Sequence, residues 1–62
     1  MGTVFDMQAF YRWLAEASDK ELVQRHSILL VFIKNVETVS TRENAQFHLR
    51  KIEEEMLVRA LK

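Results

Sequence analysis

The sequence predicts an all-α protein built from a short N-terminal helix followed by an antiparallel helical hairpin. Proline is absent and the only glycine is Gly2, so the turn residues that separate strands in a sheet protein are missing. Two segments, Ser18–Glu21 and Ser40–Glu43, match the capping box. In this motif a serine oxygen accepts a backbone N–H at a helix start, and a glutamate three residues later bonds back to the serine N–H. Each box precedes a segment of periodic apolar residues, which favours a helix start at both places.

These signals divide one domain into three helices. Asp6 is a plausible cap for the first helix, and the two serines cap the others. The link over residues 38–40 is short, so the second and third helices should fold back on each other as an αα-hairpin. The boundaries that we expect are 6–17, 19–37 and 41–61, within a single helical domain over residues 1–62.

The hairpin carries apolar seams of coiled-coil type. Apolar residues recur at intervals of three and four in both long helices, the spacing that suits near-antiparallel packing with a left-handed twist. The seam of the third helix is Ala45, Leu49, Ile52 and Met56, and that of the second is Leu22, His26, Leu29, Ile33 and Val36.

The run from Ile28 to Ile33 is apolar at every position and predicts a second copy of the chain. Six consecutive residues point in every direction around a helix, whereas one neighbouring helix covers only one side. A chain of this length buries only about 60% of its unfolded surface, and it has no cysteine for a disulfide staple. We therefore expect a homodimer with a four-helix-type core; a monomer sealed by the first helix is the alternative. The expected dimer interface is Ile28, Leu29, Val31, Phe32 and Ile33.

The aromatic residues gather near the N-terminus, where four of the six lie within the first thirteen positions. One stripe at helical spacing should dock the first helix on the hairpin, and the remaining aromatics lie away from its centre. Trp, Tyr and Arg dominate interface energetics, so these residues can form a partner-binding patch; packing within the chain is the alternative. The docking stripe is Met7, Phe10, Tyr11 and Leu14. The candidate partner-binding residues are Phe5, Tyr11, Arg12 and Trp13.

The third helix also has a charged face over residues 50–59. Weak surface pairs at i, i+4 would make it a solvated face. The functional alternative assigns Glu53 and Glu54 to an acidic patch that meets a basic partner surface, including a DNA-binding face. The pairs that the spacing predicts are Arg50–Glu54, Lys51–Glu55 and Glu55–Arg59.

Composition argues against several other classes of protein. Nine basic and nine acidic residues leave no net charge to attract nucleic acid or a membrane surface, and no apolar run approaches the ~20 residues of a membrane span. There is no cysteine nucleophile and no glycine-rich phosphate loop. His26 and His48 lack an evident third ligand, so we expect no metal, no cofactor and no enzyme activity. A cytoplasmic protein-binding protein is expected, and a small DNA-binding transcriptional regulator of helix-turn-helix type is the alternative.

The segment Glu21–Arg25, the hairpin that follows it and the segment Ile52–Arg59 resemble small proteins that temperate phages of Gram-negative bacteria use to disarm host factors. The nearest type is the quorum-sensing anti-activator, and the likeness covers residues 18–60 in pattern. This resemblance implies a compact helical dimer in the host cytoplasm. It further implies inhibition of a LuxR-type transcription regulator through its DNA-binding domain, or engagement of a type IV pilus assembly ATPase. The acidic face would suit the regulator, and the aromatic face a hydrophobic pocket.

Overall fold

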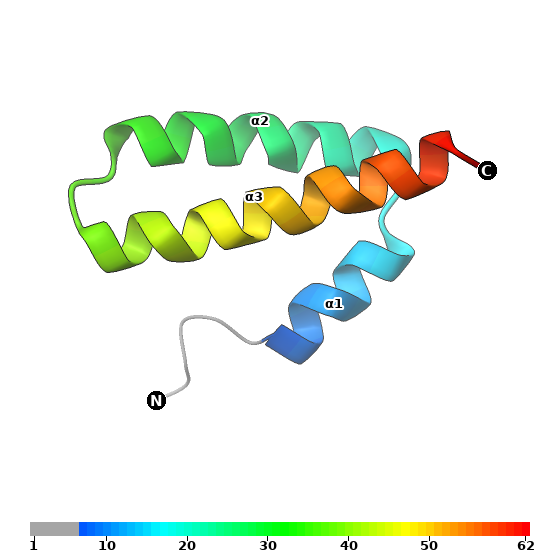
Figure 1. Cartoon of the computed structure of the whole chain (residues 1–62), viewed down its shortest axis with the longest axis horizontal. Helices are drawn as coiled ribbons and strands as arrows, with labels where there is room; N and C mark the ends of the chain where they lie inside the picture. Colours follow the sequence, from blue (N-terminus) through cyan, green and yellow to red (C-terminus); the bar gives the residue numbers. More distant parts are fainter. Residues whose placement is uncertain (1–6) are drawn as a thin grey trace.

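A computed structural model describes residues 7–62, and these residues form three helices and no strand. α1 spans Met7–Glu16, α2 spans Asp19–Asn35 and α3 spans Val39–Ala60. α2 and α3 lie side by side as an antiparallel hairpin, and α1 lies beside the C-terminal half of α3 (Figure 1). The predicted all-α class and the helix-plus-hairpin order are therefore confirmed. The expected cap Asp6 and the candidate partner residue Phe5 lie outside the described residues.

α2 begins with the capping box that the sequence predicts. The Ser18 hydroxyl accepts the Glu21 N–H at 3.1 Å, and the Glu21 carboxylate accepts the Ser18 N–H at 2.8 Å. The bond from the Ser18 backbone, and then that with its side chain, lowers the pKa of Glu21 because both favour the ionised carboxylate. Only Ala17 and Ser18 separate α1 from α2, so the cap also fixes where the chain turns.

The second capping box does not form, so this prediction is wrong. α3 begins at Val39, before Ser40, and its N-cap is Thr38, whose side chain makes no capping hydrogen bond. A contact with α2 accounts for the earlier start. The Arg42 guanidinium donates to the Val36 carbonyl at 2.7 Å, which satisfies an acceptor left over at the end of α2. Arg42 reaches it from one turn inside α3, where its own N–H bonds to the Thr38 carbonyl.

The core lies where the three helices meet, at the open end of the hairpin. Leu22 and Ile52 are fully buried, and Leu14 brings α1 into the same cluster. All nine seam positions predicted for α2 and α3 are buried or half-buried, so the seams are confirmed as the packing surface of the hairpin. The half-buried residues packed against the core are Phe10, Trp13, Leu29 and Met56.

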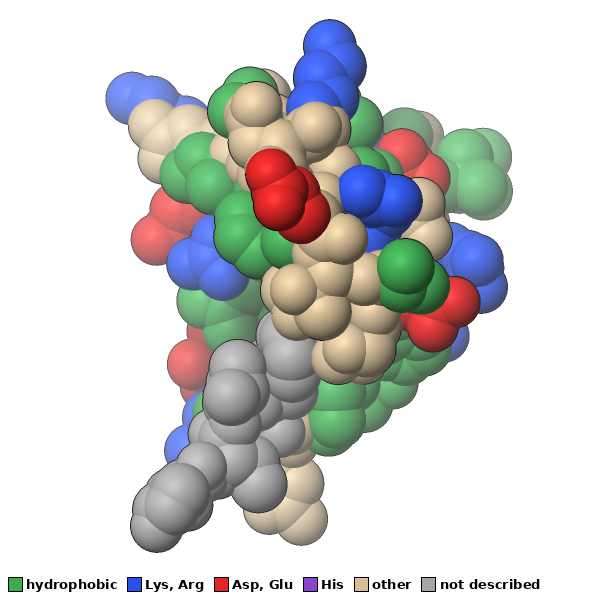
Figure 2. All heavy atoms as spheres, turned by 90° about the vertical axis from the view of Figure 1, so that its left-hand side faces the viewer, with side chains coloured by type: hydrophobic (Ala, Val, Ile, Leu, Met, Phe, Trp, Pro, Cys, Tyr) green, Lys and Arg blue, Asp and Glu red, His purple; other side chains and the backbone are tan. Residues whose placement is uncertain are grey.

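Much apolar surface remains exposed outside this small core. Among residues 7–62, ten large hydrophobic side chains are exposed by 43% or more, whereas five residues form the buried core. Figure 2, which looks onto the turn end of the hairpin, shows hydrophobic side chains reaching the surface between charged ones. Of the five expected dimer-interface residues, Ile28, Val31 and Phe32 are exposed, and Leu29 and Ile33 lie half-buried in the seam.

Candidate protein-binding groove

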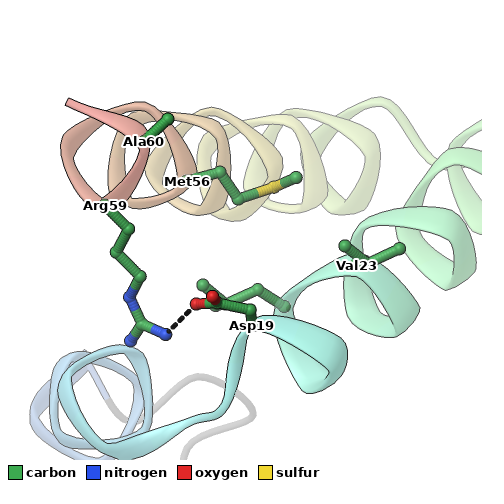
Figure 3. Close-up of a pocket in the computed structure, with 6 residues that line it drawn as sticks. Asp19, Val23, Met56, Arg59 and Ala60 are labelled. Atoms are coloured by element: carbon green, nitrogen blue, oxygen red, sulfur yellow. Dashed lines mark hydrogen bonds and ion pairs between the residues drawn. The ribbon is translucent and has the colours of Figure 1, made fainter. Parts of the chain in front are cut away.

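Arg59 of α3 ties the C-terminal end of α1 to the hairpin. Its guanidinium donates to the Leu14 carbonyl at 2.9 Å and to the Ala17 carbonyl at 2.7 Å. It also bonds the carboxylates of Asp19 and Glu55, each at 2.9 Å. Figure 3 shows Arg59 reaching from α3 across to Asp19 at the start of α2. Because the Leu14 carbonyl is one of those left unpaired at the end of a helix, this fork caps α1 and ties together all three helices.

The carboxylates around Arg59 also stabilise its charge. The hydrogen bond with Asp19, followed by that with Glu55, raises the pKa of Arg59 further above its usual range. The Glu55–Arg59 pair is the one pair that the spacing predicts and the structure contains. In place of the predicted Lys51–Glu55 pair, Lys51 bonds Glu54 one turn away, because Arg59 already holds Glu55. The predicted pair of Glu54 with Arg50 does not form.

Two ring contacts also hold α1 against the hairpin. The Phe10 ring stacks on His48 of α3 with 4.2 Å between centroids, and the Arg25 guanidinium of α2 lies 4.7 Å from the centroid of Trp13. Burial, and secondarily the positive charge of Arg25, lowers the pKa of His48. The stack therefore favours the neutral imidazole. Phe10 and Trp13 are thus engaged within the chain, whereas Tyr11 is 47% exposed.

A groove of about 320 Å³ runs between α1 and α3. Its walls combine an aromatic ring and aliphatic side chains with three charged groups. Tyr11 and Val58 are each about half exposed along it, so a partner side chain can reach its apolar surface. The lining residues are Tyr11, Leu14, Ala15, Lys51, Glu54, Glu55 and Val58.

Glu54 is the carboxylate of the groove that is most available to a basic group. Its side chain is 57% exposed, and its only ion pair within residues 7–62 is a 3.4 Å contact with Lys51. Such an exposed pair within one helix is weak. The Lys51 ammonium also lies 5.4 Å from the centroid of the Phe47 ring, so the ring shares the attraction of this positive charge with Glu54. Glu55 is 30% exposed and bonded to Arg59, so its charge is already balanced.

The structure brings together two of the residues predicted to bind a partner and separates the others. Tyr11 and Glu54 line the same groove. Trp13 lies with Arg25 beside α2, and Arg12 is exposed outside the groove lining. Glu53 bonds His26 of α2 at 2.9 Å, because consecutive helical residues diverge by about 100° and point to different surfaces.

Sequence reasoning missed Lys51 and Val58 as groove residues. The sequence signal for both residues is their spacing from Glu54. Lys51 precedes Glu54 by three positions and Val58 follows it by four, so all three lie on the same helical face. This spacing shows that the three residues share one face of α3. It does not show that this face meets α1, because that follows from the long-range bonds of the Arg59 fork.

The structure offers neither a metal cluster nor a membrane span in the part that it describes. Over residues 7–62 no three His, Asp or Glu side chains gather closely enough to hold a metal ion. The two histidines have separate partners, Glu53 for His26 and the Phe10 ring for His48. No helix within the same range is long and apolar enough to cross a bilayer.

Comparisons with protein-family models, with curated proteins and with solved structures find no match for this chain.

Proposed function

We propose that the chain is a non-enzymatic protein-binding module that modulates a partner protein through the groove between α1 and α3. One observation carries the proposal: Tyr11 and Glu54, distant in sequence, line the same open groove together with the aliphatic Leu14 and Val58. An aromatic wall beside an exposed carboxylate suits a helix of the partner that carries an apolar residue next to a basic one.

The partner that we propose is a basic helical surface of a DNA-binding domain. Such domains carry Arg and Lys on the helix that enters the DNA groove, and a carboxylate such as Glu54 can pair with them. A module bound there would compete with DNA and so act as an inhibitor. The resemblance to phage quorum-sensing anti-activators points to a LuxR-type regulator in the host cytoplasm, with a pilus assembly ATPase as the second partner that it implies.

We further propose that the chain acts as a homodimer. The support is the exposure of Ile28, Val31 and Phe32 on α2, at 61%, 60% and 43%. Full burial of a large apolar side chain contributes ~1.5–3 kcal/mol, so covering these three would add roughly 2–5 kcal/mol per chain. The total stability of a domain of this length is only about 3–9 kcal/mol. A second copy would therefore add a large fraction of the stability of one chain.

An affinity capture from a lysate of the bacterial host, with and without nuclease, tests the groove. We expect a stoichiometric protein band that survives nuclease with the unaltered chain and is lost with Tyr11→Ala. Val39→Ala is the control, because Val39 is also exposed and apolar but lies at the turn end of the hairpin, outside the groove. Capture that disappears with nuclease, or capture of nucleic acid alone, would instead support a small DNA-binding regulator.

A further inference from the structure

The exposed apolar residues on the outer side of α2 form a compact patch, here called the α2 triangle. It consists of Ile28, Val31 and Phe32, whose i, i+3, i+4 spacing puts them on one helical face. Taking about 200 Å² for a fully exposed large side chain, the triangle presents roughly 300 Å² of apolar surface. Patches of this size on a monomer are often functional. The next residues along the same face, Gln24 and Asn35, are polar and exposed.

A small hollow adjoins the triangle. It has a volume of about 160 Å³ and shares Ile28 with the triangle. Trp13 and Arg25 stack on each other in its lining, and these are the residue types that most often anchor protein interfaces. An apolar patch of this kind suits a two-fold interface, since rotation about an axis through the triangle places the same patch of each copy against the other, with the hollows beside it.

We infer that a second copy of this chain docks on the α2 triangle and its hollow, with the two α2 helices crossing at the triangle. The exposed polar residues Gln24, which also lines the hollow, and Asn35 limit the apolar contact to a short stretch of α2. Such a contact suits helices that cross at an angle of about 50° better than helices packed along their whole length. The four-helix-type core expected from the sequence would then be formed by a crossed pair of hairpins.

The size of the surface agrees with a second copy as the occupant. A standard interface buries about 800 Å² on each partner, of which somewhat more than half is apolar. The triangle supplies roughly 300 Å² of that apolar area, and the Trp13–Arg25 hollow extends it onto α1. Trp13 is thereby assigned to the dimer rather than to the bound partner. The groove lined by Tyr11 and Glu54 has no residue in common with this surface, so each copy of the dimer presents its own groove.

Light scattering of the purified chain tests the dimer. At about 100 µM, where mass action favours association, we expect twice the single-chain mass of 7.4 kDa. Val31→Glu and, independently, Ile28→Lys should restore the single-chain mass while keeping the helical circular dichroism, because both residues are exposed in one copy. Leu57→Glu is the matched control, since Leu57 is as exposed as Ile28 but lies on α3. A single-chain mass for the unaltered protein, or equal disruption by Leu57→Glu, would overturn the inference.

Disulfide crosslinking distinguishes crossed from lengthwise packing. The chain has no cysteine, so single-cysteine variants report only the introduced position. Val31→Cys should form a disulfide-linked dimer readily, because a disulfide needs Cα atoms about 4.4–6.8 Å apart and Val31 lies near the crossing point. A mixture of Gln24→Cys and Asn35→Cys should not crosslink. Efficient crosslinking in that mixture, with little for Val31→Cys, would mean antiparallel lengthwise packing and refute the crossing.

This inference rests on the proposed homodimer, and its failure can be told apart from failure of the groove proposal. Tyr11→Ala should keep the double mass and lose partner capture. Val31→Glu should lose the double mass and still capture the partner, with weaker retention on a multivalent surface because bivalency is lost. Loss of the double mass by Tyr11→Ala would contradict the assignment of separate surfaces.

Discussion

Ile52 and Ile28 are the same side chain in opposite environments, so one substitution made at both positions tests how the chain is packed. Ile52 is fully buried where the three helices meet, and Ile28 is 61% exposed on the outer side of α2. Ile52→Ala removes buried methyl groups and leaves a cavity, which costs about 3–4 kcal/mol. Ile28→Ala removes atoms that lie mostly in water and should cost less than about 1 kcal/mol in the single chain.

These magnitudes are large relative to the stability of a small domain. With about 3–9 kcal/mol in total, Ile52→Ala removes a third or more of the stability, whereas Ile28→Ala stays close to the parent protein. The measurement is urea denaturation followed by circular dichroism, at a concentration low enough for the chain to be monomeric. Equal losses of unfolding free energy for the two variants would refute the described core. At concentrations where the proposed dimer would form, the loss for Ile28→Ala should increase, because the second copy would bury the side chain.

Three further predictions concern the helix start, the aromatic stack and the Arg59 fork. Ser18→Ala should cost about 1 kcal/mol of unfolding free energy because it removes a working N-cap, whereas Ser40→Ala should cost a few tenths; similar losses in urea denaturation would contradict the assignment of the caps. Folding lowers the pKa of His48, so protonation of this side chain favours the unfolded chain. The contribution of neutral His48 to the unfolding free energy is therefore complete above about pH 6.5 and is lost as the pH falls toward the lowered pKa of the folded state. Urea midpoints that fall no more steeply with acid than those of a His48→Gln variant would argue against this. Arg59→Lys keeps the positive charge but not the forked hydrogen bonds that hold α1. The fluorescence emission of Trp13, the only tryptophan, should therefore shift to the red while most of the helical circular dichroism remains. An unchanged emission spectrum would show that α1 is held without the fork.

The parts of the fold that follow from local chemistry could be predicted from the sequence. The capping box at Ser18 and the seam spacing of α2 and α3 depend on residues within a few positions of one another. The same capping motif at Ser40 failed because the start of α3 is decided by a contact between helices, the Arg42 bond to the Val36 carbonyl. A local motif gives candidate helix starts, and tertiary hydrogen bonds select among them.

The candidate site could be predicted residue by residue but not as an assembly. Tyr11 and Glu54 were each identifiable, one as an aromatic of the candidate partner-binding patch and the other as part of an acidic face. Their convergence depends on how α1 lies against α3, and the Arg59 fork sets this through bonds to Leu14 and Ala17 that span more than 40 residues of sequence. The spacing revealed Arg59 only as an i, i+4 partner of a glutamate.

The groove is tested most directly by the affinity of the captured partner for two neighbouring charge reversals. Glu53 and Glu54 are similarly exposed, at 54% and 57%. Only Glu54 lines the groove, whereas Glu53 lies beside His26. In calorimetric titrations with the purified partner, Glu54→Lys should weaken binding at least about tenfold, which corresponds to ~1.4 kcal/mol, and Glu53→Lys should leave it within about threefold. An equal loss for both variants, or a larger loss for Glu53→Lys, would contradict the groove as the binding site.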